Sequence, residues 1–188
     1  MEGAWCIKTV VVDLETTNLR SDIGSLIVAC FGDMDADGNV TTLRTQDIID
    51  IGKGTVAQRE RKLILWAIEQ WTDADIIIGQ NHKAFDQKFL QGVMLRHGIM
   101  DGILPKRILI DTYQTGKGSF GMGMSMGNVV DVLGIGKKDA PEKGDWREAN
   151  TGDPEALARI RLRCESDVVM TGEMWRRLKP TYMSKYGR

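Results

Sequence analysis

Residues 11–17 read VVDLETT, and they end an apolar, β-branched run, 7–14, that has the composition of a buried strand. Asp13 and Glu15 stand two positions apart at the end of that run. Residues two apart on a strand project from the same face, with Cα atoms about 6 to 7 Å apart. Two carboxylates on one face of a buried strand are costly unless a cation or protons neutralise them. The alternative is a strand end that reaches solvent, with Asp13 in a turn and Glu15 in a surface ion pair.

The segments around this strand predict further strands and then helices. Residues 26–31 and 40–44 have strand composition, and together with the first strand they predict a three-strand antiparallel meander. The other expected elements are a helix from Thr55 through Trp71, strands at 76–78 and 107–113, helices at 89–97 and 125–133, and a last helix that Asp153 and Pro154 begin. Residues 116–127 are expected to form a glycine-rich loop, and 134–152 an irregular connection. The pattern predicts a single domain, 1–188, of the α/β class, in which helices flank a mixed sheet of the meander plus parallel strands.

The last helix has the clearest periodicity. Its apolar positions follow one another at steps of three and four, which predicts one buried stripe: Leu157, Ile160, Cys164, Val168, Thr171, Trp175 and Leu178. Asp167 lies about 60° from the centre of that stripe, given 100° per residue. This carboxylate is therefore expected at the margin of the core. The alternative role for Asp167 is an exposed ion pair with Arg163, four residues earlier.

A further acidic candidate is Asp86, in the segment GQNHKAFDQKFL that follows the strand at 76–78. Its position near the start of a helix has two interpretations. Asp86 is either the helix N-cap, a role that Asp favours, or a third acidic segment of the site that Asp13 and Glu15 begin.

Composition excludes several classes of protein. The 188 residues carry 25 basic and 26 acidic side chains, so a strongly basic, sequence-reading DNA binder is disfavoured and any nucleic-acid contact must use local basic patches. No apolar run approaches the roughly 18 residues of a membrane span, and Glu2 stands where a signal peptide has Lys or Arg, so a cytoplasmic protein without membrane contact is expected. Three cysteines without CxxC spacing argue against a disulfide framework and a zinc site.

Three acidic motifs match a known pattern in order, type and context. They are VVDLETT with Asp13 and Glu15, GQNHKAFD with Asp86, and RCESDVVMT with Asp167. The sequence thus resembles the DEDD superfamily of 3′-5′ exonucleases. The resemblance implies a ribonuclease-H-like fold, which agrees with the meander, central strand and flanking helices read from the sequence.

Spacing within the motifs is most similar to the proofreading exonuclease domain of family B DNA polymerases. Asn81 stands four residues before Phe85 and five before Asp86, and Cys164 stands three before Asp167. The resemblance implies a metal-dependent 3′-5′ exonuclease that acts on the 3′ end of single-stranded nucleic acid, with DNA favoured over RNA. A separate polymerase or repair protein is a further expected partner.

The same resemblance implies two Mg²⁺ or Mn²⁺ ions, with Asp13 bridging both. Glu15 and Asp167 would bind the ion that holds the attacking water, and Asp86 the ion at the leaving group. The chemistry agrees, because hard divalent cations take oxygen ligands and four carboxylates offset their charge. Further substrate-binding residues are expected in the motifs and in the glycine-rich loop: Thr16, Thr17, Asn81, Phe85 and Lys117.

One family element is missing. Active relatives carry a Tyr four residues before the last Asp or a His five before it, whereas this chain has Arg163 and Leu162. Arginine is effectively always protonated, so Arg163 is expected to bind a phosphate instead. His82 and Tyr113 are the possible replacement bases. The alternative function is a catalytically weakened nucleic-acid-binding module that keeps the exonuclease fold without the usual Tyr or His.

Overall fold

A computed structural model describes residues 7–121, 123, 125–136 and 144–186. Its elements alternate between strands and helices after an initial run of three strands. In chain order they are β1 (Thr9–Thr16), β2 (Leu26–Met34), β3 (Val40–Asp47), α1 (Val56–Thr72), β4 (Ile76–Gly79), α2 (Asp86–Arg96), the short 3₁₀ helix η1 (Met100–Gly102), β5 (Ile108–Asp111), α3 (Thr112–Phe120), α4 (Met126–Val132), α5 (Asp145–Thr151) and α6 (Pro154–Tyr186).

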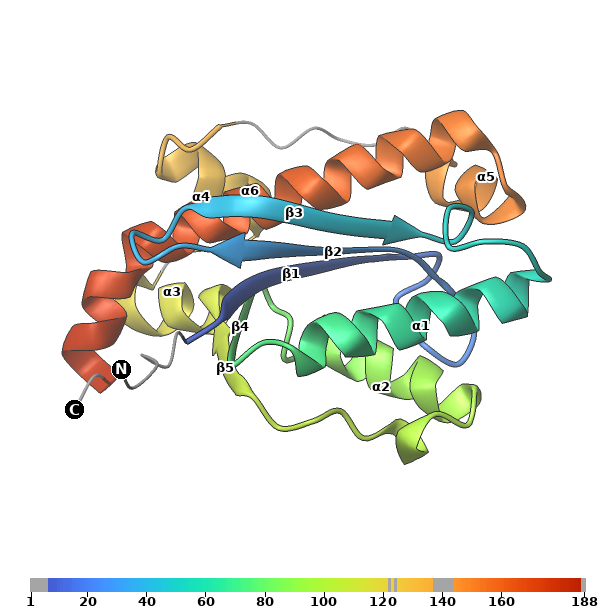
Figure 1. The fold of residues 1–188 in the computed structure, drawn as a ribbon. Coiled ribbons are helices and arrows are strands. Elements are labelled where there is room, and N and C mark those ends of the chain that lie inside the picture. The colour runs from blue at the N-terminus through green and yellow to red at the C-terminus, as the bar shows by residue number, and fades with distance from the viewer. Residues whose placement is uncertain (1–6, 122, 124, 137–143, 187–188) are drawn as a thin grey trace.

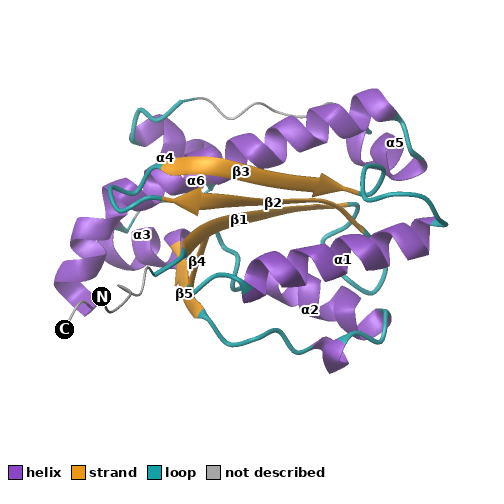
Figure 2. Ribbon diagram, viewed as in Figure 1, coloured by secondary structure: helices purple, strands orange, loops and turns teal. Residues whose placement is uncertain are grey.

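The five strands form one mixed sheet in the order β3-β2-β1-β4-β5. β1 is antiparallel to β2, and β2 to β3, whereas β4 is parallel to both β1 and β5. Figure 1 shows α1 and α2 on one face of the sheet and α6 on the other, and Figure 2 shows helices covering both faces. The predicted α/β fold, a meander plus parallel strands flanked by helices, is confirmed, and it is ribonuclease-H-like.

β1 is the central strand because its apolar residues can be buried from both faces. Val10 and Val11 have no exposed surface, and Leu14 is 5% exposed. β4 pairs with β1 only over 9–11, whereas β2 pairs along the whole strand. The carboxyl-terminal half of β1 is therefore not paired with β4, and side chains can contact its backbone along that edge.

α6 lies close against the sheet, and its predicted apolar stripe is confirmed as buried. Two glycines permit the close approach. A Cβ at Gly32 of β2 would lie 2.7 Å from Val168 Cγ1, and a Cβ at Gly172 of α6 would lie 2.5 Å from Val40 Cγ2. These short distances leave no room for a larger side chain at either position, so the glycines determine how near α6 lies to β1.

The strands at 26–31 and 40–44 extend to Met34 and Asp47, the helix expected at 89–97 begins at Asp86, and three larger differences fall within 107–152. The strand expected at 107–113 ends at Asp111, because the Asp111 carboxylate accepts hydrogen bonds from the Tyr113 and Gln114 N–H groups and begins α3. The first part of the expected glycine-rich loop is helical as far as Phe120, with Gly121 as a left-handed cap at φ 63°. The expected irregular connection contains α5, which is enclosed by two glycines with positive φ and buries Ala149.

No helix within the described ranges combines the length and apolar character that crossing a membrane requires.

Candidate metal centre

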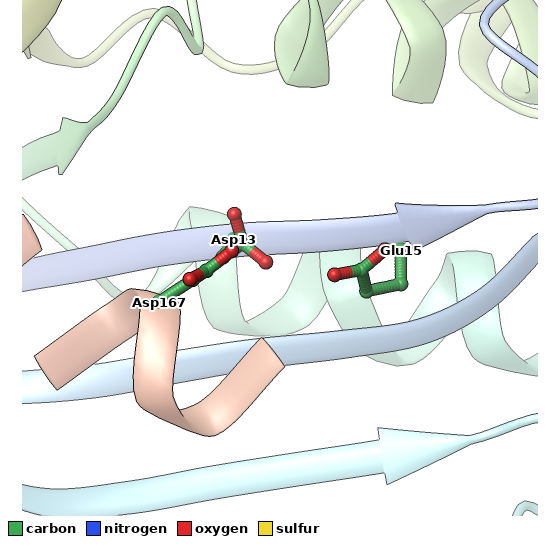
Figure 3. Close-up of side chains that lie close together, drawn as sticks. All are labelled: Asp13, Glu15 and Asp167. Atoms are coloured by element: carbon green, nitrogen blue, oxygen red, sulfur yellow. The ribbon is translucent and has the colours of Figure 1, made fainter. Parts of the chain in front are cut away.

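Three carboxylates from two elements converge between β1 and α6. Asp13 and Glu15 project from one face of β1, as period two requires, and Asp167 projects from α6. One oxygen atom from each of the three lies within 4.8 Å of the others. Figure 3 shows the three side chains directed toward a common space between the strand and the helix. The structure therefore brings together two of the three predicted acidic segments.

Asp86, the third segment, lies along the edge of β1 at the start of α2. Its Oδ1 accepts a hydrogen bond from the Leu14 N–H at 3.1 Å, on the stretch of β1 that β4 leaves unpaired. The N-cap of α2 is Phe85 rather than Asp86. Asp86 is outside the group of three but close enough that its charge acts on Asp13.

The electrostatics of this region disfavour ionised carboxylates. Burial is the main cause that raises the pKa of Asp13 well above its usual range, and the charges of Asp86, Glu15 and Asp167 raise it further. Burial also raises the pKa of Asp86 to about 7, although its backbone hydrogen bonds act in the opposite direction. A bound cation would relieve both effects.

The residues present fit a hard divalent cation. Asp13 Oδ2 is buried and accepts no hydrogen bond from the described residues. A buried oxygen without a hydrogen-bond partner raises the free energy of the folded state unless a ligand binds it. The donors in the group are all carboxylate oxygens, which Mg²⁺ and Mn²⁺ prefer. Asp13, Glu15 and Asp167 could thus hold such an ion, with Asp86 beside them.

Arg163 lies inside the acidic region. Its Nε donates to Glu15 Oε1 at 3.0 Å, and its guanidinium approaches Asp167 Oδ2 at 3.8 Å. The Arg163 guanidinium also lies 5.7 Å from the centre of the Trp146 ring. The ion pair with Asp167 that the sequence offered as an alternative is therefore present, but the shorter contact is with Glu15 on β1.

His82 and Tyr113, the possible replacement bases, lie in different surroundings. His82 has no exposed surface, and its Nδ1 lies 3.2 Å from the Gly79 carbonyl oxygen and 3.9 Å from Asp111 Oδ2. Burial lowers the pKa of His82 to about 4, against a smaller upward effect of Asp111. The imidazole is therefore neutral at pH 7. Tyr113 lies in the first turn of α3, not at a strand end. It packs against an apolar cluster that α4 and α6 form: Met126, Val129, Val130, Met170 and Met174.

The two threonines expected to bind substrate shape the loop after β1. Thr17 exchanges backbone and side-chain hydrogen bonds with Ser25, at 3.0 and 2.8 Å. The Thr16 hydroxyl donates to the Asn18 carbonyl oxygen at 2.9 Å. These contacts hold residues 17–25 as a closed loop at the carboxyl end of the strand.

The other expected substrate-binding residues are spread around the site. Asn81 has a left-handed backbone, φ 60°, and its N–H donates to Asp111 Oδ1 at 3.0 Å. Phe85 packs against Phe89, with ring centres 5.8 Å apart, and lines an open groove of about 300 Å³. Lys117 is on α3, with its ammonium 5.8 Å from the centre of the Tyr113 ring. Substrate contact by any of them stays a prediction.

Sequence reasoning missed Asp111 and Trp146. Asp111 is 2% exposed, and its carboxylate accepts N–H groups from Asn81 and Lys83 as well as from Tyr113 and Gln114. It thus fixes the loop that leads to Asp86. The signal available in the sequence was an Asp between a strand and a helix, the position of an N-cap. The signal for Trp146, which donates to Glu15, was one large aromatic residue in a polar, glycine-rich stretch.

Comparison with known proteins gives a structural similarity. No family model matches the sequence, and no curated protein matches it significantly. The fold is similar to the structure of the family B DNA polymerase from the hyperthermophilic archaeon Pyrobaculum calidifontis, with a TM-score of 0.70 and 17% sequence identity. The match covers 93% of this chain and 25% of that chain, so this chain spans about a quarter of the polymerase. The similarity establishes the fold.

Proposed function

We propose that this chain is a metal-dependent 3′-5′ exonuclease that hydrolyses phosphodiester bonds at the 3′ end of single-stranded nucleic acid, DNA in preference to RNA. The observation that carries the proposal is the convergence of Asp13, Glu15 and Asp167 within 4.8 Å, with Asp86 beside them. The similarity to part of a family B DNA polymerase supports it, as does the resemblance of the acidic motifs to those of the proofreading exonuclease domain of that family.

Each residue has a definite part in this proposal. Asp13, Glu15, Asp86 and Asp167 would hold two Mg²⁺ or Mn²⁺ ions. When bound, such ions lower the pKa of a water molecule and stabilise charge on the leaving oxygen. Asp13 would be the central ligand, because the charges of Asp86, Glu15 and Asp167 all act on it. Arg163, already directed into the acidic region, would contact the phosphate and orient it for attack.

Residues around the acidic group support single-stranded nucleic acid as the proposed substrate. Thr16 and Thr17 shape the loop after β1, and Phe85 lines the groove beside it with Arg20 and Lys88. An aromatic side chain next to cations is a combination that binds unpaired bases and their phosphates. His82 and Tyr113 stay the candidate replacements for the missing Tyr or His, but His82 has no exposed surface and Tyr113 packs in an apolar cluster, so either would have to act through an intervening water. The partner proteins implied are a separate polymerase or repair protein.

The test is digestion of a single-stranded DNA oligonucleotide labelled at its 5′ end, with Mg²⁺ and then Mn²⁺. A 3′-5′ exonuclease produces a ladder of shortening labelled products and releases mononucleotides. Asp13→Asn, which keeps the shape and removes the charge, should abolish the ladder. Asp37→Asn, in the exposed turn between β2 and β3, is the matched control and should leave it unchanged. Efficient cutting of a closed circular single strand would overturn the assignment.

The second candidate is a nucleic-acid-binding module of the same fold with weakened catalysis. The contact of Arg163 with Glu15 favours it, because a fixed positive charge among the carboxylates competes with a metal ion. In that case the wild-type chain binds the oligonucleotide as tightly as Asp13→Asn does and degrades it no faster. Equal rates for wild type and Asp13→Asn would select this function over the first.

A further inference from the structure

Trp146 contacts the acidic group from an element that the sequence does not reveal. Its indole Nε1–H donates to Glu15 Oε2 at 2.8 Å. The other oxygen of the same carboxylate, Oε1, accepts from Arg163 Nε at 3.0 Å. The Glu15 side chain, 11% exposed, is thus held at both oxygens by two donors that lie 5.7 Å apart from ring centre to guanidinium carbon.

The helix that carries Trp146 is firmly attached to α6. Asp145, the residue before Trp146, is 2% exposed, and its Oδ1 accepts from Arg159 Nη2 at 2.7 Å and Nε at 3.2 Å. Ala149, one turn later, is completely buried in the main core. Trp146 is therefore placed by the ion pair of Asp145 with Arg159 and by the packing of α5 on the core.

Hydrogen bonds to a carboxylate do not exclude metal binding, because each carboxylate oxygen has two lone pairs. Donors in the outer shell of a metal site fix the orientation of the ligating group and contribute strongly to metal affinity. An indole N–H suits this role because it is a donor that cannot itself ligate a cation.

We propose that Trp146 is a positioning residue that orients the Glu15 carboxylate for divalent metal binding, with α5 as its support. The proposal rests on the proposed function, in that Glu15 is taken as a metal ligand. It predicts that removing the indole N–H weakens metal binding without unfolding the chain. The opposite arrangement, in which Trp146 restrains Glu15 away from the metal, predicts tighter binding after the same change.

The experiment measures Mn²⁺ affinity of the whole chain by titration calorimetry, with free Mn²⁺ followed by electron paramagnetic resonance. Trp146→Phe keeps a ring over Arg163 and removes the N–H donor. Its Mn²⁺ affinity should fall about ten- to a hundredfold. The matched control is Trp66→Phe in α1, whose ring packs edge-on against Phe31 at 5.8 Å, and its Mn²⁺ affinity should equal that of the wild type.

Two further measurements separate positioning from general damage. The thermal midpoint of Trp146→Phe in EDTA should stay within a few degrees of the Trp66→Phe value, which excludes unfolding as the cause. In a Glu15→Gln background, Trp146→Phe should produce no further loss, because the effect passes through the Glu15 carboxylate.

The outcomes also separate this inference from the proposed function. Unchanged or tighter Mn²⁺ binding by Trp146→Phe would overturn the positioning role, whatever the nuclease assay gives. Weaker binding with no exonuclease activity in the wild type would support the role of Trp146 and refute the proposed function. A wild-type chain that binds no Mn²⁺ would refute both.

Discussion

Two buried acidic regions of this chain differ in how completely their oxygens are satisfied. Glu60, on the opposite side of the sheet, is 3% exposed, and its Oε1 accepts from the Leu26 N–H at 3.0 Å and from Arg96 Nη2 at 2.6 Å. Its Oε2 lies 2.8 Å from His97 Nε2. Asp13 instead has neighbouring carboxylates and a buried oxygen without a hydrogen-bond partner among the described residues.

The difference indicates which carboxylate serves the fold and which serves chemistry. Arg96 also donates to the Ser21 and Gly24 carbonyl oxygens, both at 2.7 Å, so the Glu60 cluster joins α1, α2 and the loop after β1. When a buried charge with all its hydrogen bonds made is removed, its partners stay buried without an acceptor, and the folded state is destabilised. Crowded like charges destabilise the chain until a ligand binds. Variants at Asp13 and Arg163 should therefore change activity, whereas a variant at Glu60 should change stability.

Asp13→Ala should have the largest effect of these variants. It should lower activity without lowering stability. Loss of the central ligand removes several kcal/mol of transition-state stabilisation, which corresponds to a rate decrease of roughly a thousandfold or more. The thermal midpoint in EDTA should be unchanged or higher, because one of several repelling charges is gone. Exonuclease assays and thermal melts check the two parts. Wild-type turnover in this variant would remove Asp13 from the site.

Arg163→Tyr tests the arginine inside the acidic group. If Arg163 binds the phosphate, the substitution removes a charge-assisted hydrogen bond worth about 1.5 to 3 kcal/mol. The rate of hydrolysis then falls roughly ten- to a hundredfold. We expect this fall. If the general base was simply lost, the new Tyr restores it one turn before Asp167, and the rate rises. Single-turnover rates across pH distinguish the two, and an accelerated variant would contradict the phosphate contact.

Glu60→Ala should act on stability and leave the metal centre intact. Removing the shared acceptor leaves the Leu26 N–H and the Arg96 guanidinium without it, at a cost of about 2 to 3 kcal/mol in the free energy of unfolding. Urea denaturation measures this change, and Mn²⁺ titration supplies the control. A change in Mn²⁺ affinity would break the contrast, because it would show that the two regions are coupled.

The effect that is smallest per pH unit is a pH dependence of metal-free stability. Folded Asp86, with its pKa raised to about 7, keeps a proton that the unfolded chain releases near pH 4. The unfolded state therefore binds fewer protons between these values, and the free energy of unfolding falls as pH rises, by up to about 1.4 kcal/mol per unit. Asp86→Asn should lower this slope in urea titrations with EDTA, and the raised pKa of Asp13 accounts for the part that stays. An identical slope in the variant would exclude Asp86 as its source.

The sequence predicted those parts of the site that depend on local periodicity. Asp13 and Glu15 share a face because strand side chains alternate, and Asp167 borders the core because helical positions repeat every 3.6 residues. The helix that begins after Thr55 and the buried stripe of α6 followed from the same local rules and are confirmed.

The remainder of the site depends on contacts between distant residues. Trp146 and Glu15 are 131 positions apart, and no periodicity links them. α5, with seven residues between two glycines, is stabilised by packing on α6 rather than by propensity, so its composition resembles a loop. Arg163 makes its shorter contact with Glu15 on β1 rather than with Asp167 on its own helix. This contact forms because α6 packs closely on the sheet.

The close packing of α6 also determines when the site forms during synthesis. The sheet and its first two helices emerge from the ribosome before residue 154, whereas Asp167 and Cys164, whose thiol donates to the Asp13 carbonyl oxygen at 3.4 Å, follow on α6. Chain elongation at about 5 to 20 residues per second allows the earlier elements to collapse first. The nascent chain therefore carries Asp13 and Glu15 without their third partner, and the acidic group assembles only once α6 has docked.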